Sequence, residues 1–134
     1  MNKKSNRTIL TIEDSGTFRN LIRMTLEFEG FKVIEASDGQ SGLDLARRKT
    51  PDLIVLDLMM PGLDGLQVCQ QLKASPGLQA IPIVLLSSSD DSDDIEACLQ
   101  HGAQSYLMKP FRPTMLIDVV RQYLPPADTL VPAG

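Results

Sequence analysis

Two kinds of apolar segment alternate along this chain. Short, almost continuously apolar runs are typical of buried strands, and longer segments in which apolar residues recur every three or four positions are typical of helices. The short runs are Thr8–Ile12, Lys32–Ala36, Asp52–Asp57, Ile83–Leu86 and Ser105–Met108. The helical periodicity covers about 15–28, 41–48, 64–74, 93–101 and 113–124. The pattern therefore predicts five strands, each followed by a helix.

Turn-forming residues mark the ends of the predicted helices. Gly30 and Gly102 follow the first and fourth helices, where a helix often ends in left-handed backbone, and prolines at 125 and 126 break the last one. The side chains expected to face the core are Phe18, Leu21, Ile22 and Leu26, then Leu66, Cys69 and Leu72, then Ile95, Cys98 and Leu99, and finally Leu116, Val119, Val120 and Tyr123.

The alternation of strands and helices predicts an α/β fold. Strands joined by helices pair in parallel, because right-handed crossovers return each strand in the same direction. We expect a doubly wound, parallel five-stranded sheet in the order 2-1-3-4-5, with helices on both faces. This order makes the first and third strands neighbours, so that the carboxyl ends of 8–12 and 52–57 meet at one edge of the sheet.

Polar residues stand at four of the strand ends. Glu13 and Asp14 follow the first strand, Asp57 ends the third, Ser87 follows the fourth, and Lys109 follows the fifth. In open parallel sheets, ligands bind at the carboxyl ends of the strands. The sequence therefore predicts that three acids, a hydroxyl and an amine lie together in one site.

The length of 134 residues suits one domain, which we place at 8–124. Residues 1–7 are expected to be an N-terminal extension, and 125–134 a disordered tail or the start of a linker. The net charge is −4, and the basic run at 47–49 falls at a predicted helix end, where cations complement the helix dipole. We therefore expect no direct binding to nucleic acid or to membranes.

The two cysteines, Cys69 and Cys98, lie in apolar helical patterns without metal-ligand spacing. They are predicted to be buried thiols in a reducing compartment. No signal-peptide core and no apolar run of about 18 residues is present, so a cytoplasmic location is expected. His101 precedes Gly102 at a helix end, where the helix dipole explains it better than catalysis does.

Three carboxylates held together repel one another unless a cation lies between them. Mg²⁺ suits such a site because it prefers oxygen ligands and is usually held by one or two carboxylates and a phosphate. Asp14 and Asp57 are the candidate ligands, and Glu13 is expected to act through water. Lys109 and Ser87 would contact phosphoryl oxygens, and a free oxygen of Asp57 could then attack phosphorus.

These residues occur within a recognisable set of motifs. The set is Glu13-Asp14, Asp57 with Met60-Pro61-Gly62 and Asp64-Gly65, Pro82-Ile83-Val84-Leu85-Leu86-Ser87, and Gly102-Ala103-Gln104-Ser105-Tyr106-Leu107-Met108-Lys109-Pro110-Phe111. In this order and spacing it resembles the receiver domain of bacterial response regulators, the CheY-like single-domain kind, over about 8–123. The resemblance implies the flavodoxin-like (βα)5 form of the predicted fold.

By this resemblance, Asp57 is the phosphoacceptor. Asp14 and Glu13 surround Mg²⁺, the backbone carbonyl of Met59 completes its coordination, and no other cofactor is implied. Lys109 contacts the phosphoryl group and precedes a cis peptide bond to a proline. The resemblance further implies that Ser87 and Tyr106 form the switch pair. Glu13 replaces the commoner Asp of the family, and Ser88 stands where Ala or Gly is usual.

The family takes its phosphoryl group from a histidine of a sensor kinase or phosphotransfer protein. Its members catalyse their own phosphorylation and dephosphorylation, so we expect a signalling domain rather than an enzyme. The face formed by 93–101, 105–108 and 113–124 is expected to bind a downstream protein, and it could also support a homodimer. Two alternatives are a phosphorylation-independent interaction module and a receiver fragment of a longer regulator or hybrid kinase. A flavin-binding enzyme is a weaker alternative, because acids occupy the first strand-to-helix loop.

Overall fold

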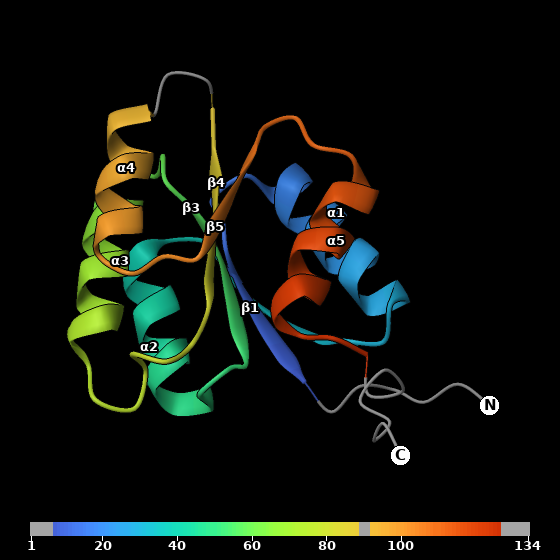
Figure 1. The fold of residues 1–134 in the computed structure, drawn as a ribbon, viewed down its shortest axis with the longest axis horizontal. Helices are drawn as coiled ribbons and strands as arrows, with labels where there is room; N and C mark the ends of the chain where they lie inside the picture. Colours follow the sequence, from blue (N-terminus) through green and yellow to red (C-terminus); the bar gives the residue numbers. More distant parts are fainter. Residues whose placement is uncertain (1–6, 89–91, 127–134) are drawn as a thin grey trace, which may run out of the picture.

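A computed structural model describes residues 7–88 and 92–126 (Figure 1). Most of the predicted extension and tail lie outside these residues. The strands are β1 Thr8–Ile12, β2 Lys32–Ala36, β3 Leu53–Asp57, β4 Ile83–Ser87 and β5 Ser105–Met108. The helices are α1 Gly16–Phe28, α2 Gly39–Lys49, α3 Gly65–Ala74, α4 Ser92–Gln100 and α5 Pro113–Tyr123.

The strands form one parallel sheet in the order β2-β1-β3-β4-β5, which confirms the predicted topology. Ile12 lies beside Leu56 of β3, and Ser87 of β4 lies beside Met108 of β5. This register brings the carboxyl ends of β1, β3, β4 and β5 to the same edge, at the top of Figure 1. The loops that carry the predicted site residues all start from this edge.

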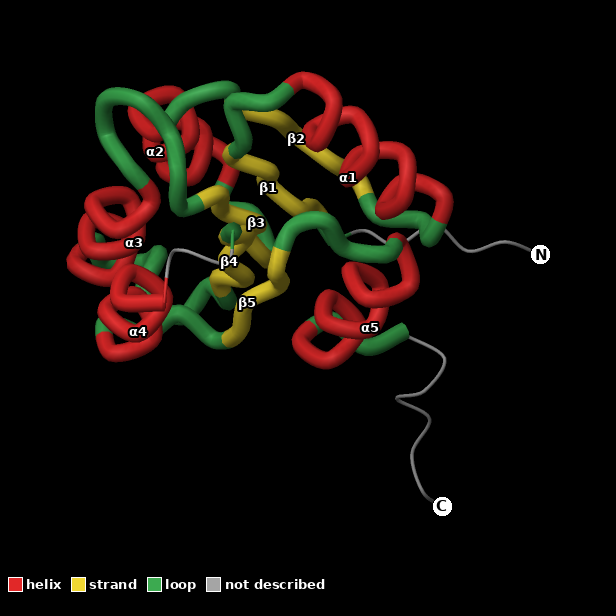
Figure 2. The backbone as a smooth tube through the Cα atoms, turned by 90° about the horizontal axis from the view of Figure 1, so that it is seen from above, coloured by secondary structure: helices red, strands yellow, loops and turns green. Residues whose placement is uncertain are grey.

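Two helical layers cover the sheet, with α1 and α5 on one face and α2, α3 and α4 on the other (Figures 1 and 2). Successive residues of the central strands point to opposite layers: Leu53 and Val55 join the core beneath α1 and α5, and Ile54 and Leu56 join the core beneath the other three helices. All four are fully buried. The continuous apolar run of β3 therefore reflects burial on both faces.

Side-chain caps fix where three helices begin. Ser15 accepts a hydrogen bond from the Phe18 amide at the start of α1, and Asp64 forms a capping box with Gln67 at the start of α3. Asp38 caps α2, which therefore begins at Gly39 rather than at the predicted residue 41. In α3, Val68 is buried beside the expected stripe, while Leu66 is only partly buried.

The start of α3 packs tightly against the loop that leaves β3. A Cβ atom on Gly65 would lie 2.6 Å from the Cα of Leu58 and 2.7 Å from the carbonyl oxygen of Asp57. A side chain at 65 would therefore displace backbone that carries the central acid of the predicted site.

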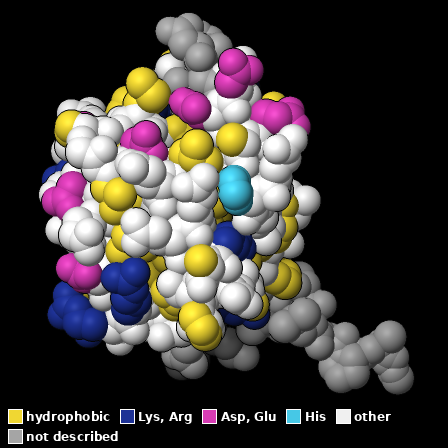
Figure 3. Space-filling view, turned by 90° about the vertical axis from the view of Figure 1, so that its left-hand side faces the viewer, with side chains coloured by type: hydrophobic (Ala, Val, Ile, Leu, Met, Phe, Trp, Pro, Cys, Tyr) yellow, Lys and Arg dark blue, Asp and Glu magenta, His cyan; other side chains and the backbone are white. Residues whose placement is uncertain are grey.

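The outer face of α2, α3 and α4 carries acidic side chains toward its upper edge and basic ones toward its lower edge (Figure 3). The basic residues of the last turn of α2, Arg47, Arg48 and Lys49, lie at a helix C-terminus as predicted. His101, the single histidine, lies on this face 3.3 Å from the side-chain amide of Gln70. In the part of the chain that the structure describes, no helix is long and apolar enough to span a membrane.

Candidate phosphoryl-transfer site

Three carboxylates meet at the carboxyl edge of the sheet. Glu13 and Asp14 leave β1, and Asp57 ends β3, which is hydrogen-bonded beside it. One oxygen from each of the three lies within 4.8 Å of the others. Glu13 is fully buried, Asp57 is 2% exposed, and Asp14 is exposed. The sheet topology thus brings together acids that are 43 positions apart in the sequence, as the strand-end pattern predicts.

Lys109 reaches into this cluster from the end of β5. Its Nζ lies 2.9 Å from Glu13 Oε1 and 3.3 Å from Asp57 Oδ2. The same nitrogen lies 4.6 Å from the centre of the Phe18 ring, which contributes a cation–π contact from α1. Phe111 packs against Phe18 with ring centres 6.0 Å apart. The cation is therefore held between two buried carboxylates and an aromatic face.

Charge in this enclosed space changes the proton affinity of both partners. Burial, and then the charge and carboxyl group of Glu13, raise the pKa of Asp57 from 3.8 to about 7, although Lys109 and the Met59 amide act in the opposite direction. Burial alone would lower the pKa of Lys109, but the Glu13 and Asp57 carboxylates outweigh it, and the pKa is raised. Lys109 thus stays protonated, and without a further cation the Asp57 carboxylate holds a proton more readily than a free one does.

The donor set fits a hard divalent cation. The three acids supply only oxygen ligands, with one acid open to solvent. Lys109 lies 2.9 Å from Glu13 Oε1 and 3.3 Å from Asp57 Oδ2, so this one amine is shared between two of the three carboxylates. A divalent cation would neutralise the negative charge that a single amine leaves in the cluster.

Hydrogen bonds from the Ser15 amide and from Arg19 hold the loop between β1 and α1. The Ser15 amide donates to Glu13 Oε2 at 3.0 Å. Arg19 Nη1 donates to the backbone carbonyls of Glu13 at 2.9 Å and Asp14 at 3.3 Å. Arg19 was not among the predicted site residues. Its position one turn after the Ser15 cap was the available signal, because helical side chains point back toward the N-terminus of the helix.

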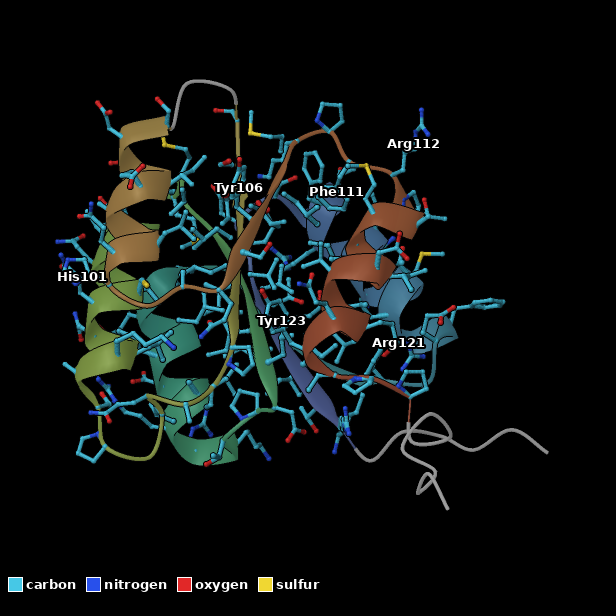
Figure 4. The ribbon with its side chains drawn as sticks, viewed as in Figure 1. His101, Tyr106, Phe111, Arg112, Arg121 and Tyr123 are labelled. Atoms are coloured by element: carbon cyan, nitrogen blue, oxygen red, sulfur yellow. The ribbon has the colours of Figure 1, made fainter. Side chains whose placement is uncertain are left out.

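Ser87 and Tyr106 lie on the neighbouring strands β4 and β5. Ser87 is fully buried, and its Oγ donates to Met108 Sδ at 3.5 Å. Tyr106 is 45% exposed, and Figure 4 shows it on β5 between the two helical layers. The Met59 amide donates to Asp57 Oδ1 at 3.2 Å, while the side chain of Met59 is exposed. The metal-binding carbonyl assigned to Met59 stays a prediction, as does the switching of Ser87 and Tyr106.

Two other sequence predictions are confirmed by the structure. The Lys109–Pro110 peptide bond is cis. Cys69 and Cys98 are buried free thiols. Although they are distant in sequence, Cys69 Sγ lies 3.8 Å from the Cys98 carbonyl oxygen, between α3 and α4. These thiols lie in the core and contribute nothing to the acidic cluster.

Comparison with known protein families agrees with the geometry of the site. The family model described as response regulator receiver domain matches residues 9–121. The chain belongs to this family. It is thus a receiver domain of the kind found in two-component response regulators, and the flavin-binding alternative is set aside.

Several relatives show how the receiver domain is used elsewhere. The DNA-binding response regulator MtrA of Mycobacterium tuberculosis is 39% identical over 116 residues, which are 87% of this chain and 50% of that protein. The chain spans about half the length of the curated relatives it matches.

Solved structures agree over nearly the whole receiver domain. The chemotaxis response regulator CheY4 of Vibrio cholerae is 25% identical with a TM-score of 0.83, covering 89% of this chain and 99% of that one. The receiver domain of a sensor histidine kinase from Pseudomonas aeruginosa is 29% identical with a TM-score of 0.82, covering 90% and 98%. That structure has a magnesium ion coordinated in its active-site cleft.

Proposed function

We propose that this receiver domain accepts a phosphoryl group on Asp57 from a phosphohistidine, with Mg²⁺ bound at the acidic cluster. The observation that supports this most strongly is the position of Lys109, whose Nζ lies 3.3 Å from Oδ2 of the buried Asp57. A protonated amine at this distance can neutralise the charge of a phosphoryl group as it arrives at the carboxylate.

In the proposed reaction, an oxygen of Asp57 attacks phosphorus while the bond between phosphorus and the donor imidazole nitrogen breaks. The imidazole leaves with the electron pair and takes up a proton, and an aspartyl phosphate remains. Lys109 moves its ion pair from the carboxylate to a phosphoryl oxygen. The buried Glu13 keeps Lys109 directed toward the site throughout, because its Oε1 lies 2.9 Å from Nζ. Water later attacks the same phosphorus and releases inorganic phosphate.

Asp14 and Asp57 would hold Mg²⁺, with the Met59 carbonyl as a third protein ligand and Glu13 acting through water. When bound, the ion supplies positive charge that screens the carboxylates from the incoming phosphoryl group. Asp14 suits this role because it is the exposed member of the cluster and leaves room for water ligands. The bound magnesium in the related Pseudomonas aeruginosa receiver domain supports the choice of ion.

The proposed response to phosphorylation begins at Ser87. Its hydroxyl would leave Met108 and donate to the phosphoryl group, and Tyr106 would turn into the space that opens. The resulting change in the surface of α4, β5 and α5 would select a downstream protein by shifting the population of two conformations. A sensor histidine kinase or a phosphotransfer protein is the proposed donor, which also implies action in the cytoplasm. The self-catalysed steps make this a signalling domain rather than an enzyme with an external product.

Intact mass spectrometry after incubation with acetyl phosphate or phosphoramidate tests the proposal. The wild-type chain should gain one phosphoryl group in Mg²⁺, and none in EDTA. The Asp57→Asn variant should gain none under either condition. Asp118→Asn is a matched control, because it removes an exposed carboxylate on α5, and it should react like the wild type. Equal labelling of Asp57→Asn and wild type would overturn the assignment and favour a phosphorylation-independent module.

A further inference from the structure

Arg19 lies near the start of α1, against the loop that carries Glu13 and Asp14. This is the loop that we propose binds a cation. A guanidinium beside a cation site would repel the ion, so its contacts with the loop call for an explanation.

The contacts of Arg19 supply that role. Nη1 donates to the backbone carbonyls of Glu13 and Asp14, at 2.9 and 3.3 Å. Nε lies 3.5 Å from Glu35 Oε1 on β2, which runs alongside β1. One guanidinium thus contacts the backbone carbonyls of both acids and a carboxylate on the neighbouring strand β2. A planar group with several fixed donors can make these contacts together, whereas an ammonium group cannot.

We propose that Arg19 is a positioning residue for the metal site: by holding the two carbonyls, it fixes the direction of the Glu13 and Asp14 carboxylates before the cation binds. The inference rests on the proposed function for the identity of the ion. Partners that orient metal ligands from outside the coordination sphere typically change metal affinity by about 10- to 100-fold. Fixing backbone rather than a ligand atom should give about tenfold, the lower end of that range.

The charge of Arg19 and its proposed positioning role predict opposite effects on Mg²⁺ binding. A guanidinium beside the site repels a divalent cation, so on charge alone Arg19→Met should strengthen Mg²⁺ binding and Arg19→Lys should leave it unchanged. If Arg19 positions the loop, both variants should bind Mg²⁺ more weakly. Arg23 is the matched control, because it lies one turn further along α1 and 3.2 Å from the same Glu35, yet the structure gives it no contact with the acidic loop.

The experiment is isothermal titration of MgCl₂ into the metal-free chain, for wild type and for Lys and Met variants at 19 and at 23. We expect the Mg²⁺ dissociation constant to rise about tenfold in Arg19→Lys and Arg19→Met and to change less than about twofold in the Arg23 variants. The inference would be overturned if Arg19→Lys had the same Mg²⁺ dissociation constant as Arg23→Lys, or if Arg19→Met bound Mg²⁺ more tightly than wild type.

A metal-free measurement separates this inference from the proposed function. Amide hydrogen exchange of Ser15, whose N–H donates to Glu13 Oε2, should be faster in EDTA in both Arg19 variants than in both Arg23 variants. Unchanged exchange at Ser15 would overturn the positioning role even if magnesium binding changed. Failure of the wild-type chain to bind magnesium would instead overturn the proposed function and, with it, the role in metal binding.

Discussion

Replacing Asp57 with Asn should stabilise the metal-free protein, and more so at pH 8 than at pH 5. The pKa of Asp57 is raised from 3.8 to about 7 in the folded chain by burial and by Glu13. The folded chain therefore keeps a proton at pH 5 that the unfolded chain has largely lost. This contribution to stability is complete below pH 3.8 and is lost as the pH rises through 7, because between these values the unfolded state binds fewer protons than the folded state. Above pH 7 both states have lost the proton, and the free energy of unfolding no longer changes with pH through this group.

The size of the effect follows from the shift. The difference between 3.8 and about 7 corresponds to about 4 kcal/mol over the full pH range. Up to about 3 kcal/mol of this falls between pH 5 and pH 8. Asn does not titrate, so Asp57→Asn does not lose this stability. The difference in the free energy of unfolding between Asp57→Asn and wild type should therefore increase by up to this amount from pH 5 to pH 8.

Urea unfolding followed by circular dichroism in EDTA, at pH 5 and pH 8, measures this difference directly. Asp118→Asn is the control, because it removes one carboxylate that lies exposed on α5 and outside the acidic cluster. Adding Mg²⁺ at pH 8 should stabilise wild type more than Asp57→Asn, since the ion binds the folded state of the wild type. A difference that is equal at the two pH values, or larger at pH 5, would refute the electrostatic account of the site.

Four further variants test the packing of the domain and the chemistry around the acids. Gly65→Ala should lower the free energy of unfolding by about 2 kcal/mol in a urea titration, since the added Cβ would clash with backbone atoms. Gly16→Ala is its control. The Cβ added at position 16 would lie no closer than 3.7 Å to another atom, so this variant should raise the free energy of unfolding by about 0.5 kcal/mol. Equal effects of the two would contradict the close packing at the start of α3. Lys109→Met should slow phosphorylation by acetyl phosphate about 100-fold in a time course of intact mass, and a rate within threefold of wild type would exclude charge neutralisation by this residue. Leu72 is fully buried in the core beneath α3. Leu72→Ala should lower the free energy of unfolding by about 2–5 kcal/mol in the same urea titration, and a decrease under 1 kcal/mol would contradict the burial of this side chain.

The hydrophobic pattern was sufficient to predict the five strands and their order. The strands are short, β3 and β4 are buried throughout, and turn residues such as Gly30 and Gly102, which both adopt positive φ, separate the elements. Helix starts were less certain. The predicted start of α2 was two residues late, because Gly39 is a weak helix former and only the cap by Asp38 shows that the helix begins there.

The convergence of Glu13, Asp14, Asp57 and Lys109 could be predicted because it depends only on strand order. The distribution of contacts within the site could not. Glu13 is fully buried and is the nearer carboxylate to Lys109, which a strand-end position does not reveal. Contacts of this kind depend on side-chain rotamers and on packing between α1 and β5, not on the hydrophobic pattern.

The central claim is that Asp57 itself carries the phosphoryl group. Borohydride reduces an acyl phosphate to an alcohol, so treating the phosphorylated chain with it and sequencing its peptides by mass spectrometry locates the modified acid. The account predicts homoserine at position 57 alone, formed in Mg²⁺ and absent in EDTA. Homoserine at 14 or at any other acid, or its formation in EDTA, would contradict the account.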